Sequence, residues 1–200
     1  MALFNSYYGG YSIPKIVWEG NKKELETSHQ SPPIKGNAVI LRNADGYIEK
    51  AMPYGIAPMI ICMLSIEPLF LIPAFVIGLF VALPLHEFMH AVFYPKGATV
   101  WVGLCLRKIS AYAISYHPLT KKRFIAMSLA PSVLGIIPLA VFVLAPITMK
   151  PLLTICIISA FMGLISPAPD YMDIVSVLRK APKTAIICDS QDGLYYCIQR

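Results

Sequence analysis

Three ionisable residues lie close together in an apolar stretch: His86, Glu87 and His90, within the run His-Glu-Phe-Met-His. On a helix, residues four positions apart share a face, so both imidazoles can bind one metal ion. Glu87 lies beside them, where its carboxylate can take a proton from a water whose pKa the metal has lowered to about 7. This HExxH pattern predicts the core of a zinc hydrolase.

A simpler interpretation is a helix end whose polar residues face water, because Lys96 follows His90 closely. Ionisable side chains inside an apolar segment are costly unless they are paired or bound to a ligand. That cost favours the metal site over the solvated helix end.

A zinc site needs a third protein ligand. A metzincin would have histidine at position 96, where this chain has Lys96, and no Asp or Glu lies between Phe88 and Pro169. The remaining candidates are His117, Asp170, Asp173, Asp189 and Asp192.

Depth in a membrane favours Asp170 or its neighbour. Asp170 precedes Arg179 by nine residues, about 13 Å of helix. His86 and His90 precede Lys96 by ten and six residues, about 15 and 9 Å. If the basic residues mark one membrane face, the three groups lie at similar depth.

Asp173 follows Asp170 by three positions and shares its helix face, so either carboxylate could face the histidines. We favour Asp170 because it directly follows the proline-rich break at 166–169. The other role for Asp173 is a charge in the first turn of the resumed helix. His117, beside Pro118, is interpreted as a solvated loop histidine, with a role toward substrate or metal as the alternative.

The composition is that of a membrane protein. Hydrophobic residues make up 56% of the 200 residues and charged residues only 14%, whereas an average soluble domain has about 25% charged residues. A soluble globule of this size needs more polar surface. The net charge of +6 is therefore attributed to cations flanking membrane spans, and no nucleic-acid partner is expected.

Five cysteines without a CxxC pair predict neither a disulfide framework nor a cysteine zinc site. We interpret them as buried thiols in a reducing compartment. No basic region followed by an apolar core opens the chain, so we expect no cleavable signal peptide.

Apolar runs predict a mainly α, polytopic membrane protein with a bundle of about four transmembrane helices. Glu67-Pro68 divides the first long run into two spans. The predicted spans are residues 52–66, 69–94, 124–149 and 151–178.

β-Structure is expected outside the spans. Thr99 to His117 is rich in β-branched and aromatic residues and predicts a β-hairpin loop. Hairpin patterns also occur around 39–48 and 186–196. The predicted organisation is an N-terminal segment, a transmembrane zincin-like core and a hairpin tail, at residues 1–50, 51–180 and 181–200.

Charge asymmetry predicts the orientation. With four spans, 16 of the 17 Lys and Arg residues share one face and only Lys150 lies on the other. The positive-inside rule then places both termini, as small β-rich segments, in the cytoplasm. We expect a multi-pass protein of a prokaryotic cell membrane.

Three segments carry a resemblance to a known family: HEFMH at 86–90, Leu129-Ala130-Pro131, and SPAPDYMD at 166–173. They resemble the putative zincin peptidases, small multi-pass membrane proteins of unknown function. That family is similar to the site-2 proteases, which cleave substrates within or near the membrane. The resemblance covers about residues 70–185.

The resemblance implies that His86, His90 and Asp170 bind one zinc ion and that Glu87 is the general base. Site-2 proteases have an LDG-type pattern where this chain has Pro-Asp-Tyr-Met-Asp, so Asp173 stays the alternative ligand. The loop from Thr99 to His117 looks like the β-hairpin that site-2 proteases hold near the active site. A free strand edge there could bind an extended peptide by strand addition.

The sequence therefore predicts a membrane-embedded zinc metalloprotease that hydrolyses a peptide or membrane-protein substrate within or near the lipid bilayer. The alternative is a non-catalytic pseudoprotease that binds a partner or senses metal. A di-metal hydroxylase is disfavoured because the chain has only four histidines.

Overall fold

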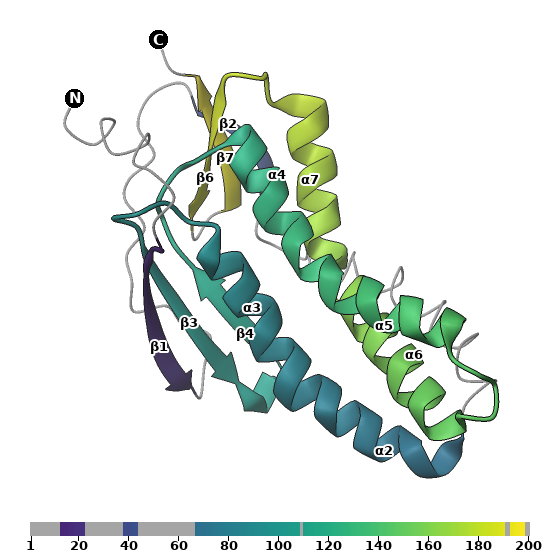
Figure 1. The fold of residues 1–200 in the computed structure, drawn as a ribbon. Helices are drawn as coiled ribbons and strands as arrows, with labels where there is room; N and C mark the ends of the chain where they lie inside the picture. Colours follow the sequence, from purple (N-terminus) through teal and green to yellow (C-terminus); the bar gives the residue numbers. More distant parts are fainter. Residues whose placement is uncertain (1–12, 23–37, 44–66, 109, 191–192, 199–200) are drawn as a thin grey trace.

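The computed structural model describes residues 13–22, 38–43, 67–108, 110–190 and 193–198 (Figure 1). Three helical segments in this part of the chain are long and apolar enough to span a membrane: Pro68–Val92, Lys121–Leu144 and Lys150–Lys180. They match the last three predicted spans. The span predicted at 52–66 lies outside the described residues, so a four-span bundle stays a prediction.

The segment that carries the HExxH motif has three parts. Helix α2 (Pro68–Ile77) continues into a π-helical stretch, η2 (Gly78–Ala82), and then into α3 (Leu83–Val92). Pro84 lies in the first turn of α3 and has no N–H to donate to the preceding turn. The π-helical stretch before it keeps the chain helical up to the histidines.

The other two segments are also interrupted. Helix α4 (Lys121–Leu129) passes through a short 3₁₀ turn, η4 (Ala130–Ser132), into α5 (Val133–Leu144). Helix α6 (Lys150–Ile165) ends at the turn of Ser166 and Pro167, and α7 (Ala168–Lys180) follows. The predicted break near the end of this span is therefore confirmed.

Helices α5 and α6 approach each other closely at two glycines. A Cβ atom added to Gly163 would lie 2.3 Å from the backbone nitrogen of Gly135. Small residues permit this backbone contact between apolar helices. The contact packs the two segments against each other below the site.

A three-stranded sheet lies beside α3 (Figure 1). Its order is β1 (Lys15–Asn21), β3 (Thr99–Cys105), β4 (Ser110–Ile114), with β1 parallel and β4 antiparallel to β3. The predicted hairpin at 99–117 is confirmed. Strand β4 forms an edge of this sheet among the described residues, and that strand contacts α3.

A second, antiparallel sheet joins both ends of the chain. Its order is β2 (Val39–Asn43), β7 (Gly193–Ile198), β6 (Ala185–Ser190), β5 (Leu119–Thr120). The predicted tail hairpin is confirmed as β6 and β7. The expected hairpin partner of β2, near 47–48, lies outside the described residues. Among the described strands, β2 pairs with β7, which is far from it in sequence.

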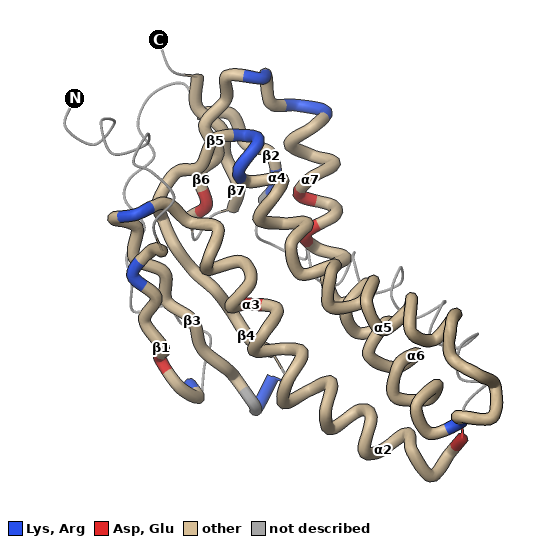
Figure 2. Tube along the Cα trace, in the orientation of Figure 1, with Lys and Arg blue, Asp and Glu red and all other residues tan. Residues whose placement is uncertain are grey.

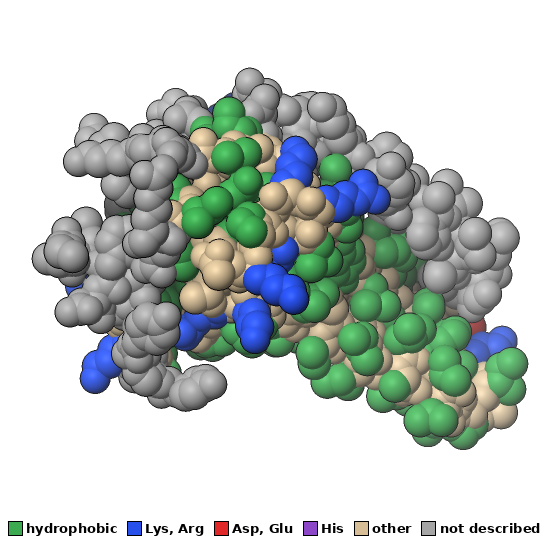
Figure 3. Space-filling view, turned by 90° about the horizontal axis from the view of Figure 1, so that it is seen from above, with side chains coloured by type: hydrophobic (Ala, Val, Ile, Leu, Met, Phe, Trp, Pro, Cys, Tyr) green, Lys and Arg blue, Asp and Glu red, His purple; other side chains and the backbone are tan. Residues whose placement is uncertain are grey.

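The buried core lies where α3, α4 and α7 meet the sheets. Val177 and Val100 are fully buried there, together with Ile187 and Leu194. Helices α2, α5 and α6, which extend away from the sheets, instead expose large apolar side chains. These side chains cover much of the helical surface in Figure 3. The most exposed of them are Leu69, Ile72, Val143 and Leu144. Such a surface suits lipid.

Charge is divided between the two ends of the helices. Figure 2 shows Lys and Arg gathered where α4 begins and α7 ends. At the opposite end, Lys150 lies 3.9 Å from Glu67. Among the described residues, the basic side chains are therefore more numerous at one end of the helices than at the other.

Candidate metal centre

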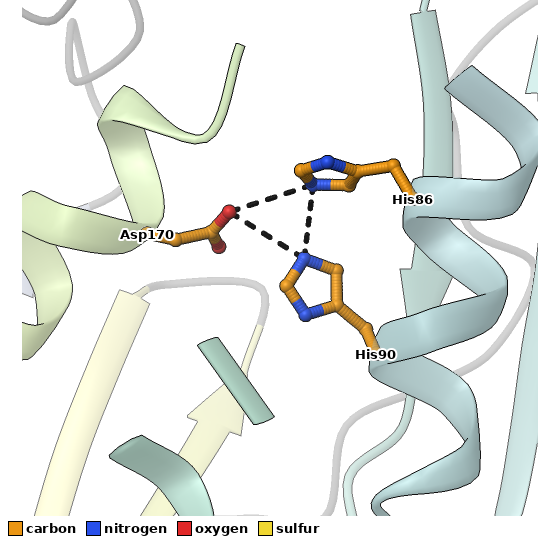
Figure 4. A group of neighbouring side chains, drawn as sticks. All are labelled: His86, His90 and Asp170. Atoms are coloured by element: carbon orange, nitrogen blue, oxygen red, sulfur yellow. Dashed lines mark hydrogen bonds and ion pairs between the residues drawn. The ribbon is translucent and has the colours of Figure 1, made fainter. Parts of the chain in front are cut away.

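Three side chains from α3 and α7 converge on one point (Figure 4). The Nε2 atoms of His86 and His90 lie 3.1 Å apart. Oδ2 of Asp170 lies 3.5 Å from Nε2 of His86 and 3.4 Å from Nε2 of His90. Among the described residues, these form the one group of three His, Cys, Asp or Glu side chains with the spacing of a metal site.

The local structure explains the convergence. His86 and His90 are one helical turn apart on α3 and are both buried. Asp170 lies in the first turn of α7, directly after the turn that ends α6. The break in the third segment therefore aims a carboxylate at the helix that carries the histidines.

Hydrogen bonding fixes which nitrogen of His90 faces the centre. Its Nδ1 lies 3.1 Å from the backbone carbonyl of Met127, and a carbonyl only accepts hydrogen bonds, so Nδ1 carries the proton. In neutral His90 the lone pair of Nε2 then points toward His86 and Asp170. Such an outer hydrogen bond is usual for a metal-binding histidine.

The spacing of the three donors fits zinc. Donors about 2.0 to 2.1 Å from a tetrahedral zinc ion lie about 3.3 Å from one another. The three sides of this triangle measure 3.1, 3.4 and 3.5 Å. The carboxylate of Asp170 and the Nε2 lone pair of His90 are directed at one point, where a divalent cation would compensate the negative charge.

Glu87 lies next to the triangle and points to the neighbouring sheet. Its carboxylate accepts a hydrogen bond from the backbone of Ala113 on β4. This contact links the HExxH glutamate to the edge strand of the hairpin. Since the N–H of Ala113 is used here, that edge of β4 faces the centre.

A cavity of about 530 Å³ opens over the centre. His86, Glu87, His90 and Asp170 all line it. Its other walls come from β4, α4, α7 and the second sheet; they include Ala111, Ser128, Arg42, Asp173 and Asp189. The cavity is large enough to take a segment of peptide beside the triangle.

Asp173 lies apart from the triangle and pairs with a cation. Nε of Arg42 lies 2.6 Å from Oδ1 of Asp173, and Nη2 lies 2.9 Å from Oδ2. The structure therefore brings Asp170, and not Asp173, into the group with the two histidines.

The remaining candidates occupy the cavity wall. His117 lines the cavity, and burial together with the nearby charge of Arg123 lowers its pKa. Desolvation by the surrounding protein raises the pKa of Asp189 to about 6, although the residue is partly exposed to solvent; Arg42 opposes the shift and Asp173 adds to it. Asp192 lies outside the described residues.

Two contributors to the site carry no sequence signal of their own. The carbonyl of Met127 is a backbone group, so its side chain gives no indication of its role. Arg42 lies in a strand far from both helices in sequence, among other basic residues. Only the tertiary structure brings them to the centre.

The family comparison agrees with this geometry. The family described as "Putative zincin peptidase" matches residues 79–186, more than half of the chain and the whole stretch from η2 to the start of β6. Searches of curated proteins and of solved structures gave no match. The matched stretch contains the HExxH motif, the β3–β4 hairpin and Asp170. The chain belongs to the putative zincin peptidase family.

Proposed function

We propose that the protein is a membrane-embedded, zinc-dependent metallopeptidase that hydrolyses peptide bonds within or near the membrane. The observation that carries the proposal is the triangle of His86, His90 and Asp170 next to Glu87, in a helix apolar enough to span a membrane. Membership of a zincin family supports the chemistry.

In this proposal His86, His90 and Asp170 would hold one zinc ion beside the cavity. Zinc bound by three protein ligands lowers the pKa of water and polarises a carbonyl group. Glu87 accepts the proton that the attacking water loses and passes it to the leaving amine nitrogen. Water is thereby added across the peptide C–N bond, and the charge of Glu87 is restored.

The hairpin supports a mode of substrate binding. The edge of β4 that faces Glu87 carries backbone groups at Ala111 and Ala113, which line the cavity. An extended peptide that pairs with this edge would have its carbonyl groups beside the triangle. The loop from Thr99 to His117 is thus proposed to bind the substrate in an unwound form.

The proposal also includes an orientation. Basic residues gather at the end where α3 and α7 end, and the triangle lies within two to three turns of that end. We place this end, and both chain termini, on the cytoplasmic side of a multi-pass protein. The active site would then open near the cytoplasmic surface.

The test uses the full chain in detergent micelles with a peptide library as substrate. We expect the zinc-loaded wild type to yield cleavage products that mass spectrometry detects. Glu87→Gln should bind one zinc per chain and lose at least about 100-fold in rate, the range for a general base. Full zinc occupancy in the wild type without products beyond those of Glu87→Gln would favour the pseudoprotease instead.

A further inference from the structure

We propose that Arg42 is a positioning residue that sets the orientation of α7 and so places Asp170 in the metal triangle. The inference rests on the proposed role of that triangle as a zinc site. It assigns a function to β2, which lies outside the stretch matched by the family.

The contact between Arg42 and Asp173 fixes both distance and angle. Two bonds, of 2.6 and 2.9 Å, join the guanidinium to the two carboxylate oxygens across 131 positions of sequence. The side chains are only 19% and 12% exposed. A bidentate arginine–carboxylate pair is geometrically more specific than a single bond or a lysine contact.

Asp173 is one helical turn from Asp170. Helix α7 begins at Ala168, directly after the turn at Ser166 and Pro167, so Asp170 lies in a turn that no earlier helical turn supports. The first backbone bond of this helix runs from the N–H of Tyr171 to the carbonyl of Pro167. A contact at Asp173 therefore restrains the turn that holds the ligand.

Strand β2 is a firm anchor for this contact. It pairs with β7 over most of its length, and Leu41 is buried in the core. A second contact ties β2 to the other end of α7, where Nζ of Lys180 donates to the carbonyl of Leu41 at 3.0 Å. The two contacts join the same two elements, but only the one at Arg42 adjoins the ligand.

The charge of Arg42 also matters to the metal. Asp173 and Asp170 are neighbouring carboxylates on one helix face, and Asp189 lies in the same cavity. The guanidinium holds the Asp173 carboxylate on the side of β2. Without this bidentate partner, that carboxylate loses the contact that directs it toward β2 and away from the metal triangle.

The experiment compares zinc binding by the full chain in micelles, using chelator competition, for Arg42→Lys, Arg42→Gln and Lys180→Met. We expect both Arg42 variants to lose about 10- to 100-fold in zinc affinity, the range for residues that orient metal ligands. Lys180→Met, which removes the other contact between the same elements, should change the affinity by less than about threefold. Unfolding temperatures without zinc serve to match the variants for stability.

A second measurement reports geometry. With Co²⁺ in place of zinc, the visible absorption of the Arg42→Lys site should differ from that of the wild type, while Lys180→Met should preserve it. If Lys180→Met and Arg42→Lys lose zinc affinity equally, Arg42 only helps to hold β2 against α7, and the inference is overturned. Unchanged affinity and spectrum in Arg42→Lys and Arg42→Gln would overturn it as well.

The outcome for the wild type separates this inference from the proposed function. Failure of the wild type to bind zinc would reject the zinc site itself. Tight binding by the wild type and by both Arg42 variants would reject only the positioning role.

Discussion

Oδ2 of Asp170 lies 3.4 Å from Nε2 of His90, although α3 and α7 are separated in sequence by a β-hairpin and three further α-helices. A contact of this length between a carboxylate oxygen and an imidazole nitrogen fits the separation of two ligands around one metal ion. It makes the third ligand testable against its neighbour, Asp173, which pairs with Arg42.

Asp170→Asn should remove high-affinity zinc binding, because an amide is a poor ligand for zinc in a histidine-rich site. We expect a loss of at least about 100-fold in affinity, beyond the range for outer-sphere residues. Asp173→Asn should still bind one zinc per chain at saturation. Titration followed by metal analysis checks both variants, and the reverse ranking would make Asp173 the ligand.

Ala111→Pro tests the edge of β4. Ala111 is two positions before Ala113 and so presents its N–H to the same side of the strand. Proline removes that donor but is tolerated on edge strands. We expect KM for an extended peptide to rise about tenfold, the loss of roughly one hydrogen bond, with zinc affinity unchanged.

Ala111→Val is the matched control, because valine keeps the N–H and suits a strand. Steady-state kinetics on both variants separate the two causes. A KM that rises equally in Ala111→Val would point to side-chain crowding in the cavity and not to strand addition.

Much of this arrangement could be predicted from the sequence, for a definite physical reason. The four-residue spacing of His86 and His90 places them on one helix face wherever the helix lies. Apolar runs and basic flanks locate the helix ends, and the proline break marks where α7 begins. These signals are local, so a single sequence contains them.

The choice between the two aspartates is not local. Asp170 and Asp173 share a helix face, and periodicity alone does not separate them. The guanidinium of Arg42 distinguishes the two aspartates, because it pairs with Asp173. Arg42 lies on β2, a strand that joins its sheet by pairing with the C-terminal β7. Pairing between strands that are far apart in sequence leaves no periodic pattern in the chain. The π-helical stretch before α3 was also not predicted, because the apolar run that contains it is uniform.

Gly163→Ala should destabilise the helical part of the protein. The added Cβ would lie 2.3 Å from the backbone nitrogen of Gly135, and backbone cannot move aside without separating α5 from α6. We expect a loss of about 1 to 3 kcal/mol, the usual cost of overpacking. Thermal unfolding in micelles, followed by circular dichroism, measures it.

Gly78→Ala is the comparison variant. Its Cβ would lie closest to the flexible side chain of Met162, which can adopt another rotamer. The loss should therefore be smaller than for Gly163→Ala. An equal or larger loss at Gly78 would contradict the view that the backbone contact between Gly163 and Gly135 is the less tolerant of the two.

Asp189 gives a pH prediction. Its pKa of about 6 in the folded protein, raised mainly by desolvation, exceeds the ordinary value of 3.8. Between these values the folded state binds more protons than the unfolded state, so this group makes stability fall as pH rises from about 4 to about 6. Asp189→Asn should remove that part of the pH dependence and raise the unfolding temperature at pH 7.5.

The unfolding temperatures of the wild type and of Asp189→Asn are measured with a chelator present. The chelator removes bound metal at every pH, so that loss of metal does not contribute to the pH dependence. The difference in unfolding temperature between Asp189→Asn and the wild type should grow from pH 4.5 to pH 7.5. A difference that stays constant over this window would show that the carboxyl group titrates as it does in water.

The position of β2 has a consequence for trimming the chain. The stretch matched by the family, residues 79–186, excludes both β2 and β7. A shortened protein that retained β7 but began after Asn43 would leave one side of β7 with unsatisfied backbone donors and acceptors, a template for pairing between molecules. Self-association of such a fragment in the test tube would then reflect an open sheet, and its oligomers would say nothing about the native assembly.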